Sequence, residues 1–242
     1  MNERFQRYAI YWTPAPETAI AQFGARWFGG VESFGLEAEF AARATRSPAH
    51  YGLHATLKAP FRLPSDTSLE ALQRSLDDFC EKRRPPPGGR LILARHQRYL
   101  TLVCAGKTAE FDWLAAECVT HFDCFRAPLV DEDRKRREID AMSGREAIFL
   151  EEFGYPYVLS DFRFHISLAG PLEDAELDEV ENALSPRLAL FMTEPFRIET
   201  LTLLGEPHDE GVFQTLSRHR FGRSGLSGPR SAAPPGGLAG KA

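Results

Sequence analysis

One short segment occurs twice in this chain, and this repeat restricts the possible folds more than any other feature. Residues 53–60 (LHATLKAP) align without a gap to residues 164–171 (FHISLAGP). Each copy has an apolar residue, a histidine, a hydroxyl residue two positions later, a leucine, and a proline at the same distance. A segment with helical spacing follows each copy, LEALQRSL in the first and LDEVENAL in the second. The chain therefore contains two copies of one supersecondary unit.

The rest of the pattern predicts strands alternating with helices. Aromatic and β-branched runs predict strands at 7–13, 52–59, 91–94, 99–105, 162–169 and 196–204. Amphipathic spacing predicts two helices within 16–45 and further helices at 68–83, 109–122 and 175–184. Ser68 is the expected N-cap of the third of these helices. The segment 100–103 (LTLV) resembles 201–204 (LTLL), a second echo after the helix of each copy.

Composition divides the chain into one expected domain and a tail. We expect a single domain over residues 1–222, with a charged helical insertion at about 128–153. Residues 223–242 are rich in Gly, Ser, Pro and Ala and are expected to be disordered, because they bury too little apolar surface to become ordered. No apolar run is long enough to span a bilayer, and the charged first residues do not open a signal peptide, so a cytoplasmic location and no membrane partner are expected.

Charge and motif content exclude several function classes. The net charge is −5, which argues against a long nucleic acid as partner but leaves room for a small phosphorylated substrate. The four cysteines form no CxxC pair, so we expect buried thiols, no metal site and no cofactor. Glycines form neither a P-loop nor a dinucleotide fingerprint. The oligomeric state does not follow from the sequence.

Strand alternation indicates which side chains of the repeats face the same way. In the first copy His54, Thr56 and Lys58 share one face. In the second copy Arg163 and His165 share a face with Ser167. If the two units pair by a pseudo-twofold axis, these polar faces meet across a cleft.

This residue set suits the opening of a phosphate ester. A histidine with an ordinary pKa near about 6.5 can act as a base or an acid at neutral pH, so one imidazole takes a proton from water and the other protonates the leaving alkoxide. We expect Thr56 and Ser167 to donate to the phosphate oxygens and Lys58 and Arg163 to offset charge in the transition state. Tyr11 is expected to line the cleft and to stack on a base or a sugar. The remaining histidines, which have no matched motif, are expected to be non-catalytic: His50, His96, His121, His208 and His219.

The paired HATL and HISL motifs resemble those of the 2H phosphoesterase superfamily. With RYAIYWTP near the start, YGLHATLKAPF and FHISLAGP, the chain looks like the bacterial, DUF1045-like family of that superfamily that is associated with phosphonate-utilisation operons. The resemblance covers roughly residues 8–222. It implies a bilobal α+β duplication of β/α units with antiparallel sheets and an active-site groove between the lobes. It also implies that His54 and His165 are catalytic and that Thr56 and Ser167 bind phosphate.

Three functions remain open at this stage. The first is a metal-independent phosphodiesterase that hydrolyses a small cyclic phosphate of a phosphoribosyl or nucleoside type, with a role in phosphonate metabolism. The second is a nucleotide or RNA-end binding module that keeps the cleft without turnover. The third is an RNA 2′,3′ end-processing or ligase-type enzyme, which uses the same groups. The sequence identifies neither the sugar nor which histidine is the acid.

Overall fold

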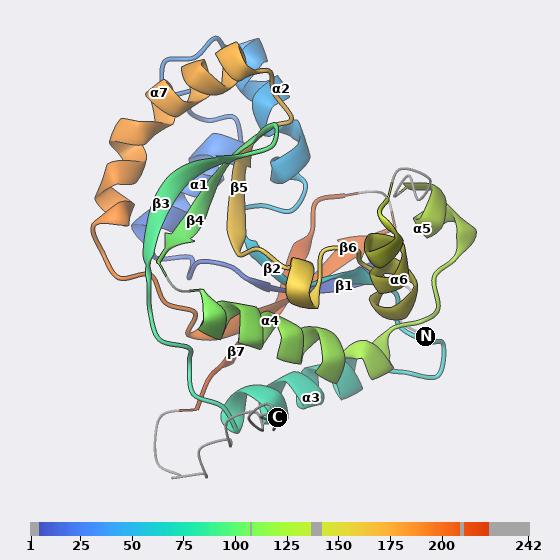
Figure 1. Cartoon of the computed structure of the whole chain (residues 1–242). Coiled ribbons are helices and arrows are strands. Elements are labelled where there is room, and N and C mark those ends of the chain that lie inside the picture. Colours follow the sequence, from blue (N-terminus) through green and yellow to red (C-terminus); the bar gives the residue numbers. More distant parts are fainter. Residues whose placement is uncertain (1–4, 107, 137–141, 209–210, 223–242) are drawn as a thin grey trace, which may run out of the picture.

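Two antiparallel sheets form two lobes of an α+β fold. The computed structural model describes residues 5–106, 108–136, 142–208 and 211–222, so the expected disordered tail lies outside the described residues. The first sheet has the order β2-β1-β6-β7 and consists of β1 (Phe5–Trp12), β2 (Ala55–Phe61), β6 (Thr200–Pro207) and β7 (Gln214–Arg220). The second has the order β3-β4-β5 and consists of β3 (Arg90–His96), β4 (Tyr99–Ala105) and β5 (His165–Ala169) (Figure 1). The bilobal antiparallel fold expected from the 2H resemblance is therefore confirmed.

Helices cover the outer faces of both sheets. The first lobe is covered by α3 (Leu69–Glu81) and α4 (Ala109–His121), which lie below it in Figure 1. The second lobe is covered by α1 (Ala19–Phe28), α2 (Ala38–Ala49) and α7 (Asp174–Met192). Two further helices, α5 (Asp131–Arg136) and α6 (Gly144–Phe153), stand to one side, and short 3₁₀ turns lie at η1 (Asp123–Phe125) and η3 (Leu159–Asp161). No helix among the described residues is long and apolar enough to cross a membrane.

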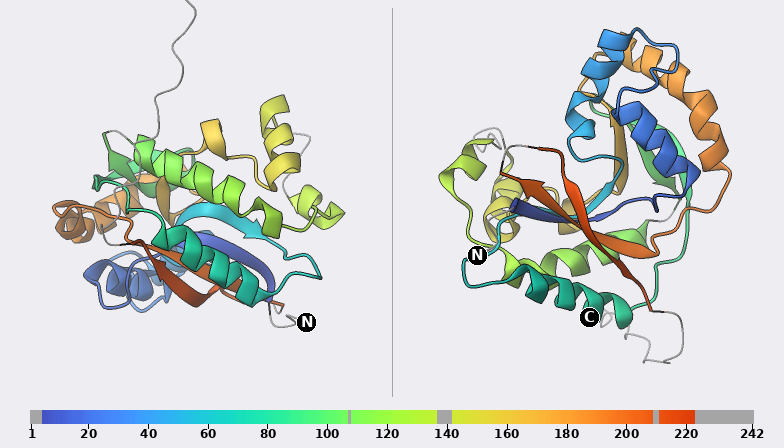
Figure 2. Two further views of the ribbon diagram at one scale, coloured as in Figure 1. Left: turned by 90° about the horizontal axis from the view of Figure 1, so that it is seen from below. Right: turned by 180° about the vertical axis from the view of Figure 1, so that it is seen from behind.

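The two halves of the sequence exchange strands between the lobes. The motif strand β2 belongs to the first sheet, but the hairpin β3–β4 that follows α3 pairs with β5 in the second. In the same way β5 belongs to the second sheet, while β6 and β7 after α7 return to pair with β1 in the first (Figure 2). Each motif strand is thus an edge strand, and the two edges face one another. The two sequence repeats therefore do not each form one lobe. Each repeat contributes its motif strand to one sheet and its later strands to the other sheet.

Each motif strand contains one extra residue directly after its hydroxyl residue. Tyr11 pairs with Thr56 and Ile10 with Lys58, so Leu57 has no partner on β1. In the second sheet Thr101 pairs with Ser167 and Leu100 with Ala169, which leaves Leu168 unpaired in the same way. Such a β-bulge shifts the alternation of side chains by one position. The two copies therefore share a backbone irregularity as well as a sequence motif.

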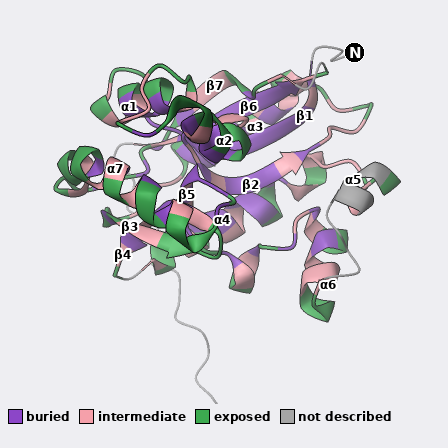
Figure 3. Ribbon diagram, turned by 90° about the horizontal axis from the view of Figure 1, so that it is seen from above, coloured by how far each residue is buried: buried purple, intermediate pink, exposed green. Residues whose placement is uncertain are grey.

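The core explains the local structure at both bulges. Leu57 and Leu168 are buried, and Trp27 of α1 donates its indole N–H to the Leu168 carbonyl over 2.9 Å. This bond satisfies a carbonyl beside the bulge in a place that water does not reach. Figure 3 shows β1, β2, β4, β5 and β6 as mainly buried, whereas the edge strands β3 and β7 and the outer faces of the helices are largely intermediate or exposed. The apolar core is therefore continuous behind both motif strands.

Most expected elements are observed, and the differences have physical reasons. Ser68 caps α3 by accepting from the Ala71 N–H, as predicted. Helices α5 and α6 lie within the segment 128–153. Strand β7 was not predicted, because its sequence is polar and pairs only as an edge strand. Helix α7 runs past the predicted residue 184 and includes Pro186. Cys80, Cys104 and Cys118 are buried, but Cys124 is exposed, contrary to expectation.

A glycine holds the tip of the β3–β4 hairpin against the chain that follows β5. Gly170 has φ +130°, a conformation that L side chains rarely adopt. A Cβ at this position would lie 2.6 Å from the Arg98 carbonyl oxygen and 2.7 Å from the Tyr99 ring. The Leu172 N–H donates to the same Arg98 carbonyl over 2.9 Å. The hairpin tip therefore depends on the absence of a side chain at residue 170.

We expect Gly170→Ala to lower the free energy of unfolding by about 1–3 kcal/mol, the usual cost of a strained backbone conformation. Gly144→Ala is the matched control, since a Cβ there meets no atom within 4 Å, and its effect should stay within about 0.5 kcal/mol. Urea unfolding followed by circular dichroism measures both. Equal stabilities of the two variants would contradict the close approach.

Candidate active site

The two motifs meet at a cleft between the lobes. The cleft has a volume of about 660 Å³, within the range of about 300–1,000 Å³ that is usual for small-molecule sites. Its walls include Tyr11 and the motif side chains His54, Thr56, His165 and Ser167. Residues more than 100 positions apart in the sequence are thus brought together, as the repeat predicts.

The two histidines are held in the same way. The Nδ1 atom of His54 donates to the Gly52 carbonyl over 2.9 Å, and that of His165 donates to the Arg163 carbonyl over 2.7 Å. Each acceptor lies two residues before its histidine. Because a carbonyl only accepts, Nδ1 carries the proton and Nε2 is the basic nitrogen of each neutral ring. The two imidazoles therefore have the same tautomer and the same Nδ1 hydrogen bond to a backbone carbonyl.

The surroundings of the two histidines differ. Burial, partly opposed by the Gly52 hydrogen bond and reinforced by the nearby charge of His165, lowers the pKa of His54 to about 4. Burial also lowers the pKa of His165, against its bond to the Arg163 carbonyl and together with the charge of His96. His54 is thus neutral at pH 7. A proton shared by the pair resides more easily on His165.

Tyr11 lines the cleft beside His54. Its ring stacks on His54 with centroids 4.2 Å apart and an interplanar angle of 25°. It is buried beside Phe213, Ala9 and Leu204. Burial raises the pKa of Tyr11 well above its usual value, so the hydroxyl stays protonated. Tyr11 therefore supports the His54 ring as an uncharged wall.

Lys58 does not lie in the cleft, which corrects the prediction from strand alternation. The bulge at Leu57 turns Lys58 to the face of its partner Ile10, on the side of the core. Its Nζ donates to the Val119 carbonyl over 3.1 Å and pairs with Asp123 over 3.2 Å. Burial lowers the pKa of Lys58, against the pull of Asp123. Lys58 is thus a buried structural cation.

Arg163 does line the cleft and is exposed. Its Nη1 atom donates to the Ser160 carbonyl over 2.9 Å and to the Phe162 carbonyl over 2.6 Å. Within the described part of the chain no carboxylate lies in ion-pair distance of this guanidinium. The remaining nitrogens of Arg163 are the cationic donors that the cleft offers to an anion.

Several lining residues were not identified from the sequence. Five of the six tyrosines of the chain line the cleft, and two carboxylates do so as well. Asp161 is paired with Arg145 over 3.2 Å. These residues come from the 128–153 segment, the loop after it and the hairpin tip, which no repeat marks in the sequence: Glu146, Tyr155, Tyr157, Asp161, His96, Gln97 and Tyr99.

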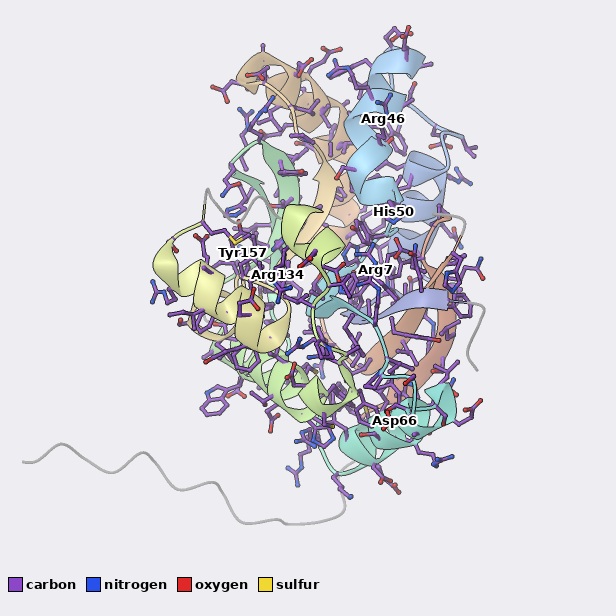
Figure 4. All side chains as sticks on the ribbon, turned by 90° about the vertical axis from the view of Figure 1, so that its right-hand side faces the viewer. Arg7, Arg46, His50, Asp66, Arg134 and Tyr157 are labelled. Carbon is purple, nitrogen blue, oxygen red and sulfur yellow. The ribbon has the colours of Figure 1, made fainter. Side chains whose placement is uncertain are left out.

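A buried ion cluster anchors the backbone that leads to His54. Glu206 accepts from the Nη2 atom of Arg7 over 2.7 Å and contacts the Nε2 atom of His50 over 3.0 Å. Figure 4 labels Arg7 and His50, which lie close together near the middle of that view. The Phe213 N–H donates to the His50 carbonyl over 3.1 Å. The residues just before Gly52 are therefore fixed on both their side chain and their backbone.

No group of three or more metal-ligating side chains gathers in the part of the chain that the structure describes. The polar side chains that line the cleft carry imidazole, hydroxyl, guanidinium, amide and carboxylate groups. Two basic nitrogens, two hydroxyl groups and one cation line a volume large enough for a small molecule.

The family model described as "Protein of unknown function (DUF1045)" matches residues 56–214. The chain belongs to this family. Two curated relatives are both named ribose 1,5-bisphosphate phosphokinase PhnN. The protein from Janthinobacterium sp. (strain Marseille) is 30% identical over 238 residues, covering 93% of this chain and 52% of the relative. That from Laribacter hongkongensis (strain HLHK9) is 27% identical over 216 residues, covering 86% and 50%. The chain thus spans about half the length of the curated relatives it matches.

Solved structures with a related arrangement are more distant. E. coli LigT complexed with NADP+ has a TM-score of 0.43 at 13% identity, over 91% of this chain and 99% of LigT. A protein titled as a phosphoesterase has a TM-score of 0.40 at 13% identity, over 90% and 99%. Usb1 of Kluyveromyces marxianus has a TM-score of 0.41 at 12% identity, over 83% and 94%.

We expect Lys58→Met to leave the affinity for inorganic phosphate unchanged, because the ammonium faces Asp123 and not the cleft. Arg163→Met is the matched comparison, because it removes a cation that lines the cleft. It should weaken binding about tenfold, as expected for the loss of a hydrogen bond to a charged group, ~1.5 kcal/mol. Calorimetric titration measures both. A larger loss of phosphate affinity in Lys58→Met than in Arg163→Met would contradict the placement of Lys58 outside the cleft.

Proposed function

We propose that this protein is a phosphodiesterase that hydrolyses a small cyclic phosphate ester without a metal ion. The observation that carries the proposal is a pair of imidazoles that face one cleft, with the same Nδ1 hydrogen bond to a carbonyl and different surroundings. General acid-base catalysis needs one neutral and one protonated group in the same site. The pair supplies both.

The lower pKa of His54 assigns the roles within the proposal. The Nε2 atom of neutral His54 takes a proton from water as the water oxygen bonds to phosphorus. The protonated Nε2 of His165 gives its proton to the ring oxygen that leaves. The hydroxyls of Thr56 and Ser167 donate to the two non-bridging oxygens, and Arg163 offsets the negative charge. One P–O bond forms and one breaks, and the phosphate monoester is the product.

The cleft walls favour a sugar phosphate as substrate. Tyrosine rings stack on sugars, and carboxylates such as Glu146 accept hydrogen bonds from sugar hydroxyls. The curated relatives carry the name of a ribose bisphosphate kinase over chains about twice as long. This sequence has no P-loop, so we assign ester hydrolysis rather than phosphate transfer from ATP to the part that it matches. A phosphoribosyl cyclic phosphate is the substrate class we propose, with a role in phosphonate metabolism.

The first test is turnover in EDTA on a panel that includes ribose 1,2-cyclic phosphate, with and without a 5-phosphate, and nucleoside 2′,3′-cyclic phosphates. His54→Gln and His165→Gln should each lower kcat about 10²–10⁴-fold, the usual range for a general acid or base. His121→Gln is the control, since His121 contacts Ser75 away from the cleft. Binding of these ligands without turnover would support the binding module instead. Turnover only on RNA ends would support the end-processing enzyme.

The pH dependence is a second test. The base must be neutral, so activity is lost as the pH falls through the pKa of His54, about 4. The acid must be protonated, so activity is lost as the pH rises through the lowered pKa of His165. We expect kcat/KM to have a maximum below pH ~6.5, the ordinary value for histidine. An optimum above that value would contradict the assignment, provided that circular dichroism shows a folded protein throughout.

A further inference from the structure

The tip of the β3–β4 hairpin brings a third histidine to the cleft. His96 is the last residue of β3, and it lines the cleft together with Gln97 and Tyr99. Gln97 has φ +52°, an uncommon backbone conformation for a side chain of this kind. The tip is tied down by the hydrogen bond from Leu172 to the Arg98 carbonyl and by the close approach to Gly170. The position of His96 is thus built into the fold.

The ring of His96 lies against that of His165. Their centroids are 6.1 Å apart, with an interplanar angle of 30°. His96 is exposed at the rim, whereas His165 is half-buried. In the other lobe the ring that stacks on His54 is Tyr11. A tyrosine ring stays uncharged at neutral pH, whereas an imidazole ring can carry a positive charge. The two catalytic histidines therefore differ in whether the ring beside them can become charged.

We propose that His96 is a positioning residue of the active site, whose ring supports His165 and whose charge decides how readily His165 keeps its proton. The inference rests on the proposed function, because it assumes that His165 is the acid. Two like charges at this separation repel, so a positive charge on residue 96 disfavours the protonated form of His165. At a pH where His96 is protonated, His165 gives up its proton more easily.

Other titratable or charged groups face this part of the cleft. His54 comes from the strand β2, Asp161 and Arg163 from the segment before β5, and Glu146 from α6. Asp161 is already paired with Arg145. The helix α4 contributes only Ala115 and Val119 here, the helix α2 only Ser47 and Pro48, and the tyrosines Tyr51, Tyr99, Tyr155 and Tyr157 complete the wall. Burial and the hydrogen bond to the Arg163 carbonyl have the largest effects on the pKa of His165. The charge that lowers this pKa further is that of His96.

Two substitutions of opposite sign test this role. His96→Gln removes the charge, so the titration midpoint of His165 and the alkaline limb of kcat/KM should both move up by about half a pH unit, the shift for two unit charges about 6 Å apart in a water-like dielectric. His96→Lys makes the charge permanent, so both should move down. Ring signals of His165 are followed by nuclear magnetic resonance without substrate, and His165→Gln identifies them by their loss.

The readouts separate this inference from the proposed function. Shifts in opposite directions would support the role of His96 even if no substrate of the panel were turned over, in which case the hydrolase alone would be rejected. Shifts in the same direction, or none beyond those of the control His121→Gln, would overturn it, because a merely structural residue has no reason to respond to the sign of the charge.

Discussion

The extra residue in each motif strand is the constraint on which the site depends. An unbroken strand would place the histidine, the hydroxyl residue and the next polar residue on one face. The bulges at Leu57 and Leu168 end that alternation after the hydroxyl. His54 and Thr56 thus face the cleft while Lys58 turns inward to Asp123. Each motif thus directs a histidine and a hydroxyl group into the cleft.

The strand exchange makes the geometry of the cleft a property of the whole chain. Each sheet contains strands from both halves of the sequence, so neither lobe is complete without the other. The motif strands are edge strands, which leaves their outer side open to the cleft instead of to another strand. The hairpin that returns from the first half also carries His96 to the histidine of the second half. A pair of separate, tethered domains would not fix these distances.

The sequence predicts the pairing of the motifs better than their surroundings. The repeat brings out His54 and His165 because identical spacing marks both, and both line the cleft together with Tyr11. Strand alternation gives the wrong face for Lys58, because no residue type other than Leu57 itself marks the bulge in the sequence. His96 was set aside because it belongs to no motif, and only the exchange of the hairpin between lobes brings it near His165. Tertiary contacts of this kind have no local pattern to read.

The same frame explains how two equal motifs produce unequal groups. Both rings are attached to a carbonyl two residues earlier, so tautomer and direction are set locally and identically. Their protonation is set by what packs around them, which the duplication does not repeat. Tyr11 and Tyr51 pack against His54, whereas His165 stands beside the exposed hairpin tip. Acid-base chemistry needs this inequality. Two matching motifs acquire unequal histidines when only the residues of the surrounding wall diverge.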